Sequence, residues 1–208
     1  MPPLMGGRIA VLVSGSGTNL QALLDDEAIA PHVSVVLSDR PGVAALDRAS
    51  GHDVEAIVMG PSTYPDRVVY TDAVRDALIE RSVDTVVLAG YMRVLGASFF
   101  GAFPERVLNV HPALLPSFPG AHAVADALAW GVKVTGVTVH LVDEQVDHGP
   151  IVLQEAIQVR DDDTWHTLEP RVHAVEHRLL PTAVRALMEG RVVVDGRKVR
   201  IIEEEPTI

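Results

Sequence analysis

Two polar side chains that could stabilise a reacting oxyanion stand at the end of an apolar run. The segment LNVH at 108–111 places Asn109 and His111 two residues apart. Because side chains alternate along a strand, this pair projects to one side of it. An asparagine can donate a hydrogen bond to a developing oxyanion, and a histidine can carry a proton near neutral pH. The spacing therefore predicts an oxyanion site with a proton carrier, although a strand end with a satisfied histidine has the same pattern.

The residues that follow limit how far this pair can move. Proline fixes one backbone dihedral angle. The segment 112–122 contains Pro112, Pro116 and Pro119. We therefore expect the loop to hold Asn109 and His111 in place.

A carboxylate near His111 would set the charge of its imidazole. The polar segment DEQVDHGP at 143–150 supplies three candidates, which are Asp143, Glu144 and Asp147. A neighbouring carboxylate stabilises the protonated imidazole and raises its pKa. The residue types alone do not choose among the three, and a solvated acidic loop between two strands would have the same composition.

A glycine-rich segment, GSGTN at 15–19, follows the first apolar run and precedes an amphipathic one. Glycines at such a turn let backbone N–H groups approach an anion. A dinucleotide fingerprint would have a third glycine where Leu20 stands, and only Asp39 is placed to be its ribose-binding acid. The segment therefore predicts a site for the phosphate of a smaller ligand, with a plain tight turn as the alternative.

A second pattern, HAVEH at 173–177, matches the H-x-x-E-H arrangement of some zinc peptidases. His173 and His177 would share one helix face, and Glu176 would be the base. No third ligand stands at a characteristic spacing, and so short a pattern also occurs by chance. We therefore expect no metal site here.

The chain has 208 residues, a net charge of −11 and no cysteine. The negative charge argues against nucleic-acid or anionic-membrane binding. No apolar run approaches the ~20 residues of a membrane span, and the start lacks a signal-peptide pattern. The absence of cysteine fits the cytoplasm. We therefore expect one cytoplasmic domain over 1–208 that binds neither nucleic acid nor membrane.

Apolar strands that alternate with amphipathic helices predict a doubly wound, mostly parallel α/β sheet. The expected strands are 8–14, 32–38, 54–58, 84–89 and 106–110. The expected helices between them are about 18–26, 42–51 and 66–82. In such sheets the carboxyl ends of the strands face the ligand crevice, which is where GSGTN, Asn109 and His111 stand.

The pattern changes after residue 131. Strands are expected at 134–142 and 151–159, and the short polar segment between them predicts that they are antiparallel. A long helix is expected at about 164–189. It contains Pro170 and Pro181, which predict a kink or a late start. The tail RVVVDGRKVRII predicts a hairpin with Asp-Gly at its turn.

Together these motifs resemble the phosphoribosylglycinamide formyltransferases, a family of folate-dependent one-carbon transferases. The matching segments, from about 8 to 180 and in the family's order, are VLVSGSGTNLQALL, VVLAGYMRVL, LNVHPALLPSFPGAHA, GVTVHLVDEQVDHGPIVLQ and the helix with RVHAVEH. HPALLPSFPG together with D-x-x-x-D-H-G-P is typical of folate-dependent formyl transfer. Methionyl-tRNA and nucleotide-sugar formyltransferases and formyltetrahydrofolate hydrolase are related. The tRNA enzyme and the hydrolase carry extra domains, and we expect that a chain of 208 residues has no room for them.

The resemblance assigns roles to individual residues. The catalytic trio would be Asn109, His111 and Asp147. The residues against the ribonucleotide would be Gly17, Thr18, Asn19, His173 and Glu176. The residues against the folate would be Arg67, Met92, Arg93, Val94, Leu95, Asn109, Asp143, Glu144, Gln145, Val146 and Asp147. The family often has glutamine where this chain has His173, and Pro170 is a second departure from its pattern.

The resemblance also implies the reaction. A formyl group would pass directly from 10-formyltetrahydrofolate to the amine of glycinamide ribonucleotide in purine biosynthesis, through a tetrahedral intermediate and without a metal. The fold would be the Rossmann-like one of formyltransferases, with antiparallel C-terminal strands. Residues 1–105 would form a phosphate-binding half and residues 106–208 a folate and catalytic half. The two small molecules would be its partners, and a homodimer is compatible with the family.

Overall fold

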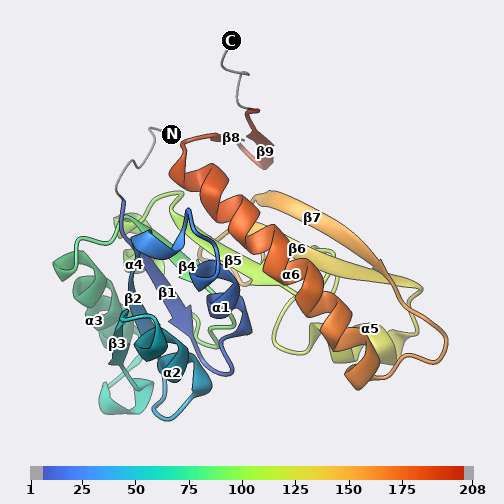
Figure 1. Cartoon of the computed structure of the whole chain (residues 1–208), viewed down its shortest axis with the longest axis horizontal. Helices are drawn as coiled ribbons and strands as arrows, with labels where there is room; N and C mark the ends of the chain where they lie inside the picture. The colour runs from blue at the N-terminus through green and yellow to red at the C-terminus, as the bar shows by residue number, and fades with distance from the viewer. Residues whose placement is uncertain (1–6, 204–208) are drawn as a thin grey trace.

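A seven-stranded sheet forms the centre of the molecule in the computed structural model, which describes residues 7–203. Its strands are β1 (Ile9–Val13), β2 (Val33–Ser38), β3 (Glu55–Val58), β4 (Thr85–Leu88), β5 (Val107–His111), β6 (Val134–Leu141) and β7 (Ile151–Gln158). They lie in the order β3-β2-β1-β4-β5-β6-β7 (Figure 1). The first five are parallel, β6 is antiparallel to β5, and β7 is antiparallel to β6. The predicted doubly wound sheet with antiparallel C-terminal strands is confirmed.

Two hydrophobic cores lie on the two faces of this sheet, because side chains alternate along each strand. Ile9, Val11 and Val13 of β1 join one core, whereas Ala10 and Leu12 join the other. The first core is covered by α1 (Thr18–Leu24), α2 (Ala44–Gly51) and α6 (Trp165–Met188). The second is covered by α3 (Arg67–Glu80) and α4 (Ala97–Ala102). Helices on both faces explain why β1 is apolar throughout.

Several short elements were not predicted. These are α4, α5 (Ala123–Trp130) and two 3-10 turns, η1 (Ala30–His32) and η2 (Pro61–Thr63). Helix α4 has six residues and α5 has eight, which is too short for a clear helical period. Helix α5 ends at Gly131, whose φ of 67° is the left-handed conformation that glycine adopts freely.

Helix α6 starts where its capping residue predicts, and both prolines lie inside it. Thr164 and Thr167 form a reciprocal capping box at its N-terminus, and the helix then runs from Trp165 to Met188. The alternative of a late start caused by Pro170 is therefore wrong. A proline inside a helix costs about 3 kcal/mol. Burial of the apolar face that includes Leu168 and Val172 against the sheet offsets this cost.

The tail forms the predicted hairpin, β8 (Val192–Asp195) and β9 (Lys198–Ile201), as a separate two-stranded sheet. Its turn contains Gly196, with a φ of 58°. None of the helices described within residues 7–203 is both long enough and apolar enough to cross a membrane.

The strand order reverses between β1 and β4, because β2 and β3 continue on one side of β1 and β5 on the other side of β4. In open α/β sheets, ligands bind at the carboxyl ends of the strands beside such a switch point. The segment GSGTN follows β1, and Asn109 and His111 end β5. The topology therefore brings the two predicted sites to one edge of the sheet.

Candidate active site

A cleft of about 400 Å³ opens at this edge. It is lined by residues of GSGTN, the segment 88–95, the end of β5, the loop 143–147 and one face of α6. All of the predicted site residues except Arg67 line it. The sequence positions that were singled out for catalysis, for phosphate and for folate thus share one cavity.

His111 is buried and held through both nitrogens of its ring. Its Nε2 lies 2.8 Å from the carbonyl oxygen of Phe118, which can only accept, so Nε2 carries a proton. Its Nδ1 lies 3.5 Å from Oδ2 of Asp147. Burial lowers the pKa of His111, while the Asp147 carboxylate and the Phe118 carbonyl oppose that lowering. Burial of the ring therefore favours its neutral form, while two acceptors stand in place for the imidazolium.

Asp147 is the carboxylate that faces the pair. Its Oδ2 accepts the backbone N–H of Gly120 at 2.7 Å, and its Oδ1 lies 3.3 Å from Nδ2 of Asn109. Burial raises the pKa of Asp147, but the hydrogen bonds and the nearby histidines outweigh it and hold the pKa below its usual range. The residue is therefore ionised at neutral pH. Among the three predicted carboxylates, Asp147 is the one whose geometry suits the charge of His111.

The proline-rich loop fixes this arrangement through its backbone. Phe118 binds His111 and Gly120 binds Asp147, as given above. Thr138 of β6 lies opposite His111 in the sheet. Its hydroxyl donates to the carbonyl oxygen of Ala113 at 2.6 Å and accepts the N–H of Leu115 at 3.1 Å. The expectation that the loop holds the pair in place agrees with these contacts.

His140 belongs to the same cluster and was not predicted. It pairs with Asn109 across β5 and β6, and its side chain is fully buried. Its Nδ1 lies 2.9 Å from the carbonyl oxygen of Leu141, so Nδ1 carries a proton and Nε2 can accept. Nδ2 of Asn109 lies 3.0 Å from that Nε2. His140 therefore orients the amide of Asn109. Only the strand pairing could have revealed this, because the sequence places the two residues 31 positions apart.

The segment 91–95 forms another wall of the cleft. Met92 and Val94 expose their side chains, and the Met92 N–H donates to Oγ of Ser14 at 2.9 Å. Arg93 donates from Nε to Oδ2 of the buried Asp39 at 2.6 Å. Arg40 is a second partner of Asp39. The carboxylate of Asp39 is thus occupied by two guanidinium groups, which argues against its use as the ribose-binding acid of a dinucleotide site.

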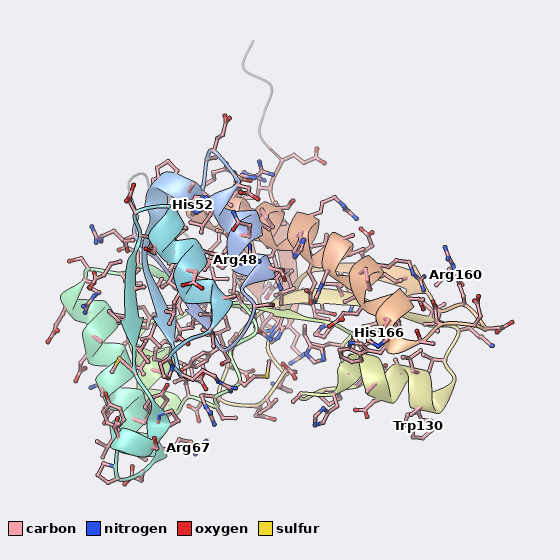
Figure 2. The ribbon with its side chains drawn as sticks, turned by 60° about the horizontal axis from the view of Figure 1, so that its bottom comes forward. Arg48, His52, Arg67, Trp130, Arg160 and His166 are labelled. Atoms are coloured by element: carbon pink, nitrogen blue, oxygen red, sulfur yellow. The ribbon has the colours of Figure 1, made fainter. Side chains whose placement is uncertain are left out.

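The loop GSGTN at 15–19, where the sequence predicts a phosphate site, is built mainly from backbone. Gly17 has a φ of 71°, and a Cβ there would lie 2.6 Å from Cβ of Ala45 on α2. Arg48, also on α2, donates from Nε to the carbonyl oxygen of Ser16 at 2.9 Å and from Nη1 to Oε1 of Gln21 at 2.9 Å. Figure 2 labels Arg48 on this helix. The bracing arginine was not predicted, because no local pattern links α2 to the loop.

Asn19 and Glu176 connect the loop to α6. Nδ2 of Asn19 donates to Oε2 of Glu176 at 3.0 Å, and both side chains are buried. Oδ1 of Asn19 has no hydrogen-bond partner among residues 7–203. Burial raises the pKa of Glu176, against the opposing effects of Asn19 and His173. Nε2 of His173 lies 4.0 Å from the same carboxylate oxygen. These three predicted residues therefore form one polar group at the cleft wall.

The H-x-x-E-H pattern does not form a metal centre within residues 7–203, where no three His, Asp or Glu side chains are placed to share an ion. The rings of His173 and His177 stack 5.8 Å apart. Burial, His173 and Arg48 lower the pKa of His177. His173 lines the cleft, and His177 lines a neighbouring groove beside the same helix.

Arg67 lies apart from the other predicted folate residues. It is the first residue of α3 and is exposed (Figure 2). It is not among the residues that line the cleft. Its assignment to the folate stays a prediction.

Comparison with known proteins shows which family the chain resembles. Residues 7–184 match the family model described as formyl transferase. The chain is 44% identical over 210 residues to the phosphoribosylglycinamide formyltransferase of Mycobacterium tuberculosis, covering 97% of each. It is 42% identical to the human trifunctional purine biosynthetic protein adenosine-3, of which it spans only 20%. The crystal structure of glycinamide ribonucleotide transformylase 1 from Symbiobacterium toebii matches with a TM-score of 0.92 and 48% identity, covering 96% of each chain. The chain therefore belongs to the formyl transferase family.

Proposed function

We propose that this chain transfers the formyl group of 10-formyltetrahydrofolate to the terminal amine of glycinamide ribonucleotide, a step of purine biosynthesis. The observation that carries the proposal is the cluster of Asn109, His111 and Asp147 at the edge of a cleft whose other side is a glycine loop. Relatives that match nearly the full length of the chain carry the name of this activity. The family implies a formyl donor derived from folate.

The reaction is a direct acyl transfer. The amine nitrogen of the ribonucleotide attacks the formyl carbon, and a new C–N bond forms while the carbonyl oxygen becomes an oxyanion. The bond between that carbon and N10 then breaks, and the proton lost by the amine goes to N10. The net change is one formyl group and one proton exchanged between two nitrogens, so no covalent enzyme intermediate is needed.

Asn109 and His111 stabilise the oxyanion in this proposal. Both N–H bonds of the Asn109 amide already have partners, at 3.0 Å from His140 and 3.3 Å from Asp147. The longer contact is the weaker one, and it is the one that an oxyanion would replace. His140 would then keep the Asn109 amide oriented through one N–H, while the second N–H of Asn109 would donate to the oxyanion.

Protonation of His111 accompanies this step. Burial disfavours the imidazolium, but a developing oxyanion and the charge of Asp147 favour it. Asp147 would sustain that charge and orient a water molecule that carries the proton from the amine to N10. The lowered pKa of Asp147 supports this role, because the carboxylate stays ionised throughout the working pH range.

The two substrates would enter from different sides. Gly17, Thr18 and Asn19 would hold the ribonucleotide phosphate, and His173 and Glu176 would approach its glycinamide end. The segments 92–95 and 143–147 would enclose the pterin ring. The division into halves, 1–105 and 106–208, stays a prediction; in this proposal each half would supply residues to both ligands. A cytoplasmic location and a homodimeric assembly accompany this proposal as predictions.

A turnover assay tests it. The wild-type chain is mixed with glycinamide ribonucleotide and 10-formyltetrahydrofolate, and the deformylated folate is followed by absorbance. We expect folate product and formylated ribonucleotide in equal amounts. Release of free formate without the amine would instead identify a hydrolase. No reaction with either, under conditions where a characterised relative is active, would reject the proposal.

A further inference from the structure

The C-terminal hairpin reaches the loop that carries Asp147. Strands β8 and β9 lie beyond residues 7–184, the part of the chain that the family model matches. The hairpin nevertheless packs beside β7, whose N-terminal end is joined to the 143–150 loop (Figure 1). Its turn presents Arg197 towards His148, the residue that directly follows Asp147.

Arg197 makes two contacts with His148. Its Nη2 donates to the backbone carbonyl oxygen of His148 at 2.8 Å. Its Nη1 lies 3.3 Å from Nε2 of the imidazole. One guanidinium thus holds both the backbone and the side chain of a single loop residue. The planar fork of arginine suits such a double contact, whereas the ammonium of a lysine is a point charge without that fixed geometry.

The imidazole of His148 passes this restraint to the other end of the loop. Its Nδ1 lies 2.8 Å from Oδ2 of Asp143. A carboxylate can only accept, so Nδ1 carries a proton and Nε2 accepts from Arg197. A chain of contacts therefore runs from Arg197 through His148 to Asp143. These contacts join the two ends of the loop, whose residues 143–147 line the cleft.

The loop needs such a restraint because part of its backbone is strained. Asp147 has a φ of 51°, a left-handed conformation that non-glycine residues rarely adopt. Such conformations persist where the surrounding contacts fix them. On the inner side, Asp147 is held by Gly120 and Asn109. On the outer side, the described contacts of the next residue are those with Arg197 and Asp143.

We propose that Arg197 is a positioning residue for the formyl-transfer reaction, which acts through His148 to hold the 143–147 loop against the folate. This inference rests on the proposed function for its kinetic consequence. Arg197 touches neither the folate nor the reacting atoms. It sets the placement of a loop that contacts the cofactor and carries Asp147.

Kinetics of three variants test the proposal. Arg197→Met removes the guanidinium, and we expect the KM for 10-formyltetrahydrofolate to rise roughly three- to tenfold, the effect of losing one or two exposed hydrogen bonds. The KM for the ribonucleotide and the thermal midpoint should not change. Arg200→Met, an exposed arginine of the same hairpin, is the matched control and should behave as wild type. Arg197→Lys should recover part of the loss, because its ammonium keeps the charge and can donate but lacks the planar fork.

Amide hydrogen exchange of the ligand-free protein separates this inference from the proposed function. Exchange over 143–148 should be faster in Arg197→Met than in Arg200→Met, whatever reaction the chain catalyses. If the wild type lacked formyl transfer but this difference appeared, the proposed function would fail and the restraint would stand. Equal exchange in the two variants, or a loss of kcat and thermal midpoint with an unchanged folate KM, would overturn the positioning role.

Discussion

The two sides of the cleft are built by different means. On the side of β5, the predicted catalytic side chains are buried or half-buried and contact one another: Asn109 meets His140 and Asp147, and Asp147 approaches His111. On the side of β1, the loop GSGTN offers mainly backbone, and its support comes from behind, through Ala45 and Arg48 of α2.

This difference indicates a division of work. Buried, interlinked side chains hold fixed charges and donors at a reacting atom, which is what stabilisation of a transition state requires. In the proposed function, the glycine loop would bind a phosphate that does not react, which needs only shape and N–H groups. We therefore expect changes on the β5 side to lower kcat, and changes on the β1 side to raise the KM for the ribonucleotide.

The largest expected effect is that of Asn109→Ala. Removal of one oxyanion donor lowers turnover by about 10²–10³. The matched variant on the other side is Asn19→Ala, which should raise the KM for the ribonucleotide with a much smaller change in kcat. Steady-state kinetics and circular dichroism of both folded variants check this. A similar kcat loss in the two variants would contradict the division between the sides.

Asp147→Asn should come next, with a loss of turnover of roughly tenfold or more near neutral pH. The charge of Asp147 raises the pKa of His111, against the lowering caused by burial. Without that charge the pKa falls further, so less imidazolium forms at a given pH and the activity that depends on it moves to lower pH. NMR titration of the His111 ring measures the shift directly.

Asp143→Asn is the control for this charge. The Asp143 carboxylate pairs with His148, whose Nδ1 lies 2.8 Å away, whereas Asp147 contacts Asn109 and approaches His111. Its removal should alter folate affinity and leave the titration of His111 in place. If Asp143→Asn lowered the pKa of His111 while Asp147→Asn did not, the carboxylate would have been chosen wrongly.

Gly17→Val should weaken ribonucleotide binding by about tenfold or more, and the structure supplies two reasons. Its φ of 71° disfavours any side chain, and a Cβ would collide with Ala45 at 2.6 Å. Gly17→Val would therefore distort the loop and block the approach of a phosphate at the same time. Gly15→Ala is the matched control, because a Cβ there meets no atom within 4 Å. Calorimetry with each substrate should show a selective loss for Gly17→Val.

A compensating substitution separates the two reasons. In Gly17→Ala with Ala45→Gly the 2.6 Å contact with Cβ of Ala45 is removed, while Cα of residue 45 still lies 2.8 Å from the new Cβ. The thermal midpoint should therefore recover in part relative to Gly17→Ala alone. If phosphate also needs a bare backbone at Gly17, ribonucleotide binding should stay weak. Full recovery of binding in this double variant would show that Gly17 serves only the packing against α2.

Much of the fold could be predicted from the sequence, because long apolar strands and amphipathic helices have clear periods. The elements that were missed, α4 and α5, are short, and α5 is apolar on most of its surface. The length of α6 was predicted but its tolerance of Pro170 was not. Packing of its apolar face against the sheet decides that outcome, and packing is not visible in a local pattern.

The site could be predicted only where chemistry and local position coincide. Asn109 and His111 share a strand end, and GSGTN is contiguous, so each pattern is complete in the sequence. Asp147 was chosen over Asp143 by family resemblance alone. His140 and Arg48 were missed because each meets its partner through tertiary structure, one across a strand pair and one from a different helix. Residues that support a site are harder to find than those that form it.

The smallest effect that still tests the comparison is that of Arg48→Met. The guanidinium holds the carbonyl oxygen of Ser16 and the amide oxygen of Gln21, both at 2.9 Å. Its loss should loosen the phosphate loop, so the KM for the ribonucleotide should rise by a factor of about three to ten. Neither kcat nor the KM for the folate should change, because the β5 side is untouched. Arg185→Met is the matched control, since Arg185 lines the same neighbouring groove as Arg48 but pairs with Asp26 at 3.5 Å instead of bracing the Ser16 carbonyl. A fall in kcat for Arg48→Met at saturating substrate would mean that the phosphate loop also sets the geometry of the reacting amine, and the two sides of the cleft would then act as one unit.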